Sequence, residues 1–327
     1  MPFMNNPSSA SSEPALLTPS ELGLVPGEPL EGNMRSRIND ALADHGSIMF
    51  RGYGLATDQD FDDFIKSFDL ENFRYDDSFS NAIRRNRSAR VFTANEAPPD
   101  VEIHLHHEMA QTLTFPTKLF FFCETAPTEG GATPICRSDI ALKNLKANNP
   151  GFVEMLKRKG VRYRNTMPAS EDRTSGQGRT WYQTLSVDSA QAAEQKLTAL
   201  GYRYRWLPGE ELSVQTPRLP AICSFNGSAE VFFNQLVAAA AGWRDITDEA
   251  EARLVYGDDS LISYADIKLM INVCYDSVVD LDWQQGDVAL IDNLKVMHGR
   301  RPYRGNRSVL AALCSPMSRQ AMAPVTA

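Results

Sequence analysis

Cysteine is scarce in this sequence, long apolar runs are missing, and basic residues are not in excess. The five cysteines among 327 residues are scattered and form no CxxC pair, which argues against a disulfide framework or a zinc site. No apolar stretch approaches the roughly 20 residues of a membrane-spanning helix, and the N-terminus lacks the pattern of a signal peptide. A net charge of −8 argues against nucleic acid as the main partner. We therefore expect a cytoplasmic protein with reduced, buried thiols.

The first 20 residues differ in composition from the rest of the chain. Residues 1–20 are rich in Ser, Pro and Asn, which predicts a disordered tail. Residues 21–327 have the composition of an ordinary globular protein and are expected to form one domain, with a helical insert at about 140–280 that could serve as a lid. The basic run at residues 84–87 is interpreted as solvated surface, because charge runs usually are.

Short strand patterns separated by helical segments indicate the fold class. The apolar run at residues 119–124 and the shorter one at 288–291 are typical of buried strands. The apolar spacing of residues 34–45 predicts a helix that ends at Gly46. Because regular alternation of strand and helix is missing, we predict an α+β protein with a jelly-roll core of antiparallel strands and flanking helices.

Three of the five histidines lie in residues 103–109, next to a carboxylate. If this stretch is a strand, then His104, His106 and Glu108 share one face and His107 takes the other. A histidine and a carboxylate on one face are part of the two-histidine, one-carboxylate set that binds non-haem Fe(II) and leaves positions open. The alternative pair, His104 with His106, would suit a cupin-like site. His107 is interpreted as structural.

A third ligand has to come from the remaining histidines, His45 and His298. His45 belongs to the predicted N-terminal helix, so His298 is the candidate. It follows a buried strand and a loop that contains Asp292 and Asn293. These two residues are interpreted as turn formers, with a hydrogen bond that orients His298 as the alternative.

Arg307 lies nine residues after the late histidine, at the start of the last predicted strand. Arginine has a planar fork that binds a carboxylate through two hydrogen bonds. An iron oxygenase needs such a residue, because its keto-acid co-substrate is held at the far end while the other end chelates the metal. Thr133, after a Gly-Gly turn, could donate a hydroxyl to the same carboxylate. Three further arginines could bind a substrate acid or be solvated: Arg300, Arg301 and Arg304.

Seven short motifs together resemble one family. They occupy residues 106–109, 120–123, 130–135, 286–287, 292–293, 297–300 and 305–307. In this order they resemble the Fe(II)/2-oxoglutarate dioxygenases of the taurine dioxygenase superfamily. Within it, the sequence is most similar to the syringomycin-biosynthesis-like and clavaminate synthase-like hydroxylases.

The resemblance implies a set of site residues and a fold. Iron would be bound by His106, Glu108 and His298, and the 2-oxoglutarate carboxylate by Arg307 and Thr133. The implied fold is a double-stranded β-helix, so that residues 21–327 would form a single oxygenase domain with a lid between the two motif blocks.

The resemblance also implies a reaction that uses O2. The expected reaction is hydroxylation of an unactivated C–H bond of a small-molecule substrate: an amino acid, its derivative or a carrier-protein thioester, in secondary metabolism. Related halogenases have a small residue in place of Glu108, so the intact glutamate favours hydroxylation. The alternatives are desaturation or cyclisation with the same cofactors, and a cupin-like protein that binds a metal or small molecule without 2-oxoglutarate turnover.

Overall fold

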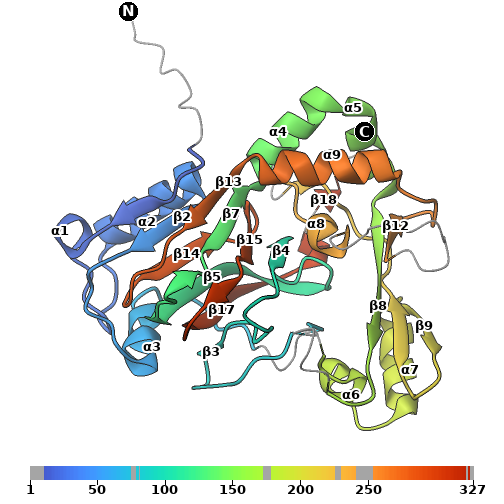
Figure 1. The fold of residues 1–327 in the computed structure, drawn as a ribbon, viewed down its shortest axis with the longest axis horizontal. Helices are drawn as coiled ribbons and strands as arrows, with labels where there is room; N and C mark the ends of the chain where they lie inside the picture. Colours follow the sequence, from blue (N-terminus) through green and yellow to red (C-terminus); the bar gives the residue numbers. More distant parts are fainter. Residues whose placement is uncertain are drawn as a thin grey trace, which may run out of the picture.

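Two β-sheets form the centre of the computed structural model (Figure 1), which describes residues 11–74, 79–80, 82–171, 178–224, 230–240, 253–321 and 323–324. The larger sheet consists, in spatial order, of β1 (Ala15–Leu17), β2 (Ser47–Phe50), β14 (Val288–Asp292), β5 (Thr114–Thr125), β17 (Ser308–Ser318) and β3 (Phe92–Thr93). The smaller sheet consists of β13 (Val278–Leu281), β7 (Thr133–Arg137), β15 (Val296–Arg300) and β4 (Ile103–His106). All of these neighbours pair antiparallel except β1 and β2, which are parallel.

The larger sheet is covered on both faces, which explains its unbroken apolar runs. On β5, Phe120 and Phe122 pack on the outer side, whereas Phe121 and Cys123 lie in the core between the two sheets. The outer side is covered by three helices (Figure 1), namely α1 (Pro19–Leu22), α2 (Gly32–His45) and α3 (Asp58–Lys66). Strand alternation therefore divides one apolar run between two cores.

The smaller sheet is covered on its outer side by a second group of helices. Leu105, Cys136 and Met297 from its strands pack in one cluster with these helices. The helices are α4 (Ser138–Asn148), α5 (Pro150–Lys159), α8 (Leu236–Ala240) and α9 (Tyr264–Tyr275). In Figure 1, α4, α5 and α9 lie along the edge of the molecule above β7 and β4.

The segment between β7 and β13 contains a third sheet besides its helices. This sheet has the order β12 (Leu254–Tyr256), β8 (Val161–Met167), β10 (Leu212–Gln215) and β9 (Arg203–Trp206), and α6 (Trp181–Leu185) and α7 (Ala190–Ala199) pack on it. The part of the chain at about 140–280, where the insert is expected, therefore contains strands as well as helices. The remaining short elements are β6 (Glu129–Gly130), which pairs with β16 (Tyr303–Arg304), β11 (Cys223–Ser224), which pairs with β18 (Ala323–Pro324), and the 3₁₀ helix Arg319–Ala321.

The structure confirms the mixed α and β class and the helix expected at residues 34–45. The prediction of a disordered tail over residues 1–20 is wrong for residues 15–17. These residues form β1, and their backbone pairs with β2 at the edge of the larger sheet. Residues 1–10 of that tail lie outside the described part. A membrane-crossing helix would need more length and apolarity than any helix in the described ranges has.

Gly46 ends α2 at a crowded position. Its φ is +75°, and a Cβ there would lie 2.6 Å from Val296 Cγ2 and 2.9 Å from Arg137 Cδ. Gly54 has a similar φ of +72°, but nothing lies within 4 Å of its Cβ position. A side chain at either position would have a strained backbone, but only one at Gly46 would also overlap with neighbouring atoms.

We expect Gly46→Ala to destabilise the protein more than Gly54→Ala. Left-handed backbone costs either alanine roughly 1–2 kcal/mol, and only Gly46→Ala adds an overlap of about 1–3 kcal/mol. Urea unfolding of both variants measures the difference. Equal losses of unfolding free energy would contradict the close packing of α2 against β7 and β15.

Candidate metal centre

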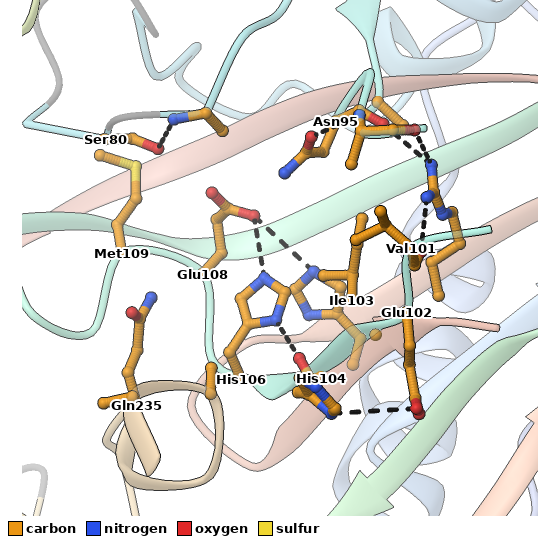
Figure 2. Close-up of a pocket in the computed structure, with 18 of the residues that line it drawn as sticks. Ser80, Asn95, Val101, Glu102, Ile103, His104, His106, Glu108, Met109 and Gln235 are labelled. Carbon is orange, nitrogen blue, oxygen red and sulfur yellow. Dashed lines mark hydrogen bonds and ion pairs between the residues drawn. The ribbon is translucent and has the colours of Figure 1, made fainter. Parts of the chain in front are cut away.

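Two histidines meet across neighbouring strands. β4 and β15 pair His106 with His298, and the two ring centroids are 4.4 Å apart. The Oε2 atom of Glu108 lies 4.0 Å from Nε2 of His106 and 3.7 Å from Nε2 of His298. Figure 2 shows the carboxylate of Glu108 directed toward the imidazole ring of His106. Among the described residues, these three are the group of side chains that could hold a metal ion, because their ligand atoms all lie within 4.8 Å of one another.

Glu108 is placed by a turn and not by a strand. β4 ends at His106, and Met109 has a left-handed φ of +58°. The buried amide of Asn293 accepts a hydrogen bond from Glu108 N at 2.7 Å and donates to Glu108 O at 3.0 Å and Pro116 O at 2.7 Å. The strand alternation expected across residues 103–109 is therefore wrong at Glu108.

Neither Asp292, the last residue of β14, nor Asn293, in the loop that follows, orients His298. Asp292 forms an ion pair with Lys118 at 3.3 Å and accepts a hydrogen bond from Leu294 N, so it acts as a turn former. The Nδ1 atom of His298 is buried and has no hydrogen-bond partner in the described part of the chain. The ring instead packs against Phe121, with centroids 5.2 Å apart.

The protonation states suit a divalent metal. Nδ1 of His106 lies 2.8 Å from His104 O, so it carries the proton, and the lone pair of Nε2 faces Glu108. Burial lowers the pKa of His106 to about 4, and His298 adds to the effect. Burial opposes ionisation of Glu108, but Arg84 and then His298 outweigh it and hold the pKa of Glu108 below its usual range. The candidate donor set thus contains the neutral imidazole of His106 and an ionised carboxylate, with the His298 ring beside them.

Arg84 is a site residue that sequence reasoning missed. Its Nη2 donates to both carboxylate oxygens of Glu108 at 3.0 Å, and the two side chains are 5% and 4% exposed. The interpretation of residues 84–87 as solvated surface is therefore wrong for Arg84, although the neighbouring Arg85 is 66% exposed. The sequence around residues 84–87 does not show which of these arginine side chains points into the protein interior.

The other two histidines of the cluster have different partners. Nδ1 of His104 lies 2.9 Å from the hydroxyl of Tyr275, and His104 is not part of the metal-ligating group. His107 is fully buried, with Nδ1 3.0 Å from Asn234 O and Nε2 3.2 Å from Ser138 Oγ. This confirms the interpretation of His107 as structural.

One cavity of about 250 Å³ joins the donor set to Arg307 and Thr133. Nε of Arg307 donates to Gly131 O at 3.1 Å. Desolvation lowers the pKa of Arg307 to about 10, with the charge of Arg300 adding to it, so the guanidinium stays protonated at neutral pH. In the described ranges, no carboxylate forms an ion pair with Arg307. A desolvated cation without a counter-charge is suited to bind an anion.

The wall around Arg307 depends on two residues besides Thr133. The buried Thr133 hydroxyl accepts a hydrogen bond from Nε1 of Trp283 at 3.0 Å, which leaves its proton for another acceptor. A Cβ on Gly131 would lie 2.8 Å from Pro127 Cγ and 3.1 Å from Arg307 Cδ. Glycine at this position therefore leaves room for the arginine stem.

The three arginines considered for a substrate acid are engaged elsewhere. Arg300 is buried and donates to the carbonyl oxygens of Ala97, Pro98 and Val101 at 2.8, 2.6 and 2.7 Å. Arg301 forms ion pairs with Glu102 and Asp280, and Arg304 is 82% exposed beside Glu129. Arg300 thus fixes the loop before β4.

The sequence matches the family described as taurine catabolism dioxygenase TauD, TfdA family, over residues 15–313. The chain belongs to the TauD/TfdA dioxygenase family. It is 36% identical over 279 residues to a clavaminate synthase-like protein of Arabidopsis thaliana, covering 85% of this chain and 84% of that protein. It is 24% identical over 295 residues to the dapdiamide synthesis protein DdaC of Enterobacter agglomerans, covering 86% and 85% of the two chains.

The fold also resembles a solved structure. PvcB, an Fe, alpha-ketoglutarate dependent oxygenase from an isonitrile synthetic pathway, superposes with a TM-score of 0.53 at 14% identity, over 94% of this chain and 89% of that one. Membership of the TauD/TfdA family confirms the predicted family and the enzyme class, an iron- and 2-oxoglutarate-dependent dioxygenase. The alternative of a cupin-like protein without turnover has no support from this membership.

Removing the Asn293 amide should destabilise the dioxygenase. Asn293→Ala leaves the buried N–H and C=O of Glu108 without their partners, so we expect the unfolding free energy to fall by roughly 3 kcal/mol. Asn148→Ala is the matched control, because Asn148 is exposed and its side chain donates to Asn144 O; its loss of unfolding free energy should stay within about 0.5 kcal/mol. Urea unfolding of both proteins measures this. If Asn293→Ala loses as little unfolding free energy as the control, then the hydrogen bonds of Asn293 to the Glu108 backbone do not stabilise the protein as inferred.

Stability should fall on acidification, partly through His107. Burial lowers the pKa of His107 to about 3, below the unfolded value of about 6.5. The unfolded state therefore binds the extra proton below pH 6.5, and folding loses about 1.4 kcal/mol per pH unit from this group. In metal-free protein, the unfolding free energy of His107→Gln should therefore fall less steeply between pH 6.5 and 4.5 than that of the wild type. The difference in slope should be about 1.4 kcal/mol per pH unit. Ser138→Ala removes a partner of His107 without removing the titrating group and should keep the slope; equal slopes in both variants would contradict the assignment.

Proposed function

We propose that this dioxygenase binds Fe(II) through Nε2 of His106, Oε2 of Glu108 and Nε2 of His298. Arg307, with the Thr133 hydroxyl, binds the far carboxylate of 2-oxoglutarate. When bound, iron and 2-oxoglutarate supply the activation of O2 for oxidation of an unactivated C–H bond. The residues of the chain bind and orient these groups and exclude water from them.

The observation that carries this proposal is the joint occurrence of donor set and cation in one cavity. A metal-binding protein without a keto acid would need only the two histidines and Glu108. Here Arg307 lines the same cavity, without a carboxylate partner in the described part of the chain. An acid that spans from the metal to the arginine satisfies both groups, and its charge offsets the desolvation of Arg307.

The fold supports the same function. We propose that the two central sheets are the halves of a double-stranded β-helix and that residues 21–327 form a single oxygenase domain. The insert at about 140–280 contributes Tyr163, Asn165 and Gln235 to the cavity wall. It is thereby positioned to cover the substrate and exclude water during the reaction.

The proposed substrate is an amino acid or an amino-acid derivative, free or carrier-bound, that is hydroxylated in secondary metabolism. Two similar proteins are named for small-molecule biosynthesis, namely dapdiamide synthesis and an isonitrile pathway. The cavity lining contains Arg253, whose guanidinium suits a substrate carboxylate group. Because Glu108 occupies the carboxylate ligand position, hydroxylation is favoured over halide transfer.

The test is anaerobic addition of Fe(II) and 2-oxoglutarate to metal-free protein. The weak visible absorption band of the chelate should appear in the wild type and vanish in His298→Ala, because a ligand is lost. Arg307→Met should need a much higher 2-oxoglutarate concentration to reach the same band. His104→Ala is the control. If His104 and His106 were the ligands, this variant would lose the band; with the proposed ligand set, it keeps the band.

A second measurement addresses turnover and substrate. In air, wild-type protein with Fe(II) should release succinate from 2-oxoglutarate, and the amino acid that is a substrate should increase this release. The absence of both the band and the succinate in wild-type protein would overturn the proposed function. Loss of the band in His104→Ala but not in His298→Ala would overturn only the ligand set.

A further inference from the structure

The buried pair of Arg84 and Glu108 is a feature that the proposed iron site does not by itself require. Nη2 of Arg84 lies 3.0 Å from both Oε1 and Oε2 of Glu108. The two oxygens differ in what else they face. Oε2 is the atom directed at Nε2 of His106 and His298, whereas Arg84 is the hydrogen-bond partner that the structure gives Oε1. Arg84 therefore contacts both oxygens, and Oε1 differs from Oε2 in that no histidine of the candidate donor set is paired with it among the described residues.

Arg84 is held in this position by its surroundings. The guanidinium carbon lies 5.1 Å from the centre of the Phe92 ring, and the side chain is 5% exposed. The next residue fixes the backbone, because Arg85 N donates to Thr93 Oγ1 and Thr93 N donates to Arg85 O, each at 2.9 Å. The loop thus brings a guanidinium against the carboxylate through contacts that do not involve the metal ligands.

We propose that Arg84 is a positioning residue that holds Oε1 of Glu108, so that the carboxylate meets the metal through Oε2 alone. This inference rests on the proposed function. A carboxylate can bind a divalent cation through one or both oxygens. When a metal takes Oε2, the hydrogen bond from Arg84 to Oε1 persists and keeps that oxygen away from the metal. A coordination position thereby remains open for the co-substrates, as the two-histidine, one-carboxylate set requires.

The charge of Arg84 allows a second interpretation with the opposite consequence. A cation beside the donor set repels a divalent metal and competes with it for Glu108. In that case removal of Arg84 would strengthen metal binding. Positioning predicts the reverse, because groups that orient a ligand typically contribute roughly 10- to 100-fold to metal affinity.

The experiment compares Mn(II) binding by metal-free wild type, Arg84→Met, Arg84→Lys and Arg85→Met. Mn(II) prefers similar oxygen and nitrogen ligands to Fe(II) and is not oxidised during the measurement. The paramagnetic resonance signal of free Mn(II) gives the Kd, and water-proton relaxation gives the number of waters on the bound ion. Arg85→Met is the matched control, because it removes an adjacent arginine that is exposed and pairs with Glu96.

In Arg84→Met we expect the Kd for Mn(II) to rise roughly 10- to 100-fold and the bound ion to lose one water, because both oxygens of Glu108 then bind it. Arg84→Lys should fall between Arg84→Met and wild type, since a single ammonium replaces the planar fork. Arg85→Met should bind as wild type does. A merely structural role of Arg84 would leave the number of bound waters unchanged.

Unchanged Kd and water number in Arg84→Met, or a lower Kd, would overturn the positioning role while the proposed function stands. Circular dichroism of the metal-free proteins checks folding. If Arg84→Met does not fold, Arg84→Lys decides: its Kd must exceed that of the wild type, and an equal Kd overturns the inference. Failure of the wild type itself to bind Mn(II), or undiminished binding by His298→Ala, would instead overturn the proposed function.

Discussion

The carboxylate of Glu108, buried between two sheets, is the interaction on which the rest of the site depends. An ionised carboxylate removed from water costs several kcal/mol unless charge and hydrogen bonds compensate it. Arg84 supplies the opposite charge, and Asn293 binds the peptide groups on both sides of the residue. His106 and His298 then direct their Nε2 atoms at the same oxygen, at 4.0 and 3.7 Å. Segments that are far apart in the sequence meet here, because each contributes a charge or a polar group that interacts with the buried Glu108.

The two central sheets determine where this charge can lie. Because helices cover the outer face of each sheet, the inner faces enclose a core, and the cavity opens within it. The pairing of β4 with β15 fixes the separation of the histidines, since directly opposite residues of antiparallel strands are neighbours. The turn after β4 then directs Glu108 back toward them. Backbone pairing and a single left-handed residue, Met109, together set the geometry of the three candidate ligands.

Three arginines around the cavity show how partners determine the role of a residue. Arg84 is neutralised by Glu108, and Arg300 is bound by backbone carbonyl oxygens. Arg307 has a single carbonyl contact and no carboxylate in the described part of the chain. Although all three carry the same charge, Arg307 is the one of them with neither a carboxylate nor several carbonyl oxygens around it in the described ranges. The function of each arginine follows from the atoms around it and not from its residue type.

The sequence by itself determined the features that depend on near neighbours. The helix at residues 34–45 with its stop at Gly46 and the buried strand around Phe121 follow from local periodicity and residue type, whereas the family was predicted from the resemblance of short motifs. The turn at Glu108 and the inward direction of Arg84 were decided by tertiary structure. Asn293 contacts a residue 185 positions away, and Arg84 one 24 positions away. Such contacts leave no periodic trace in the sequence, because the buried charge selects its partners in space and not along the chain.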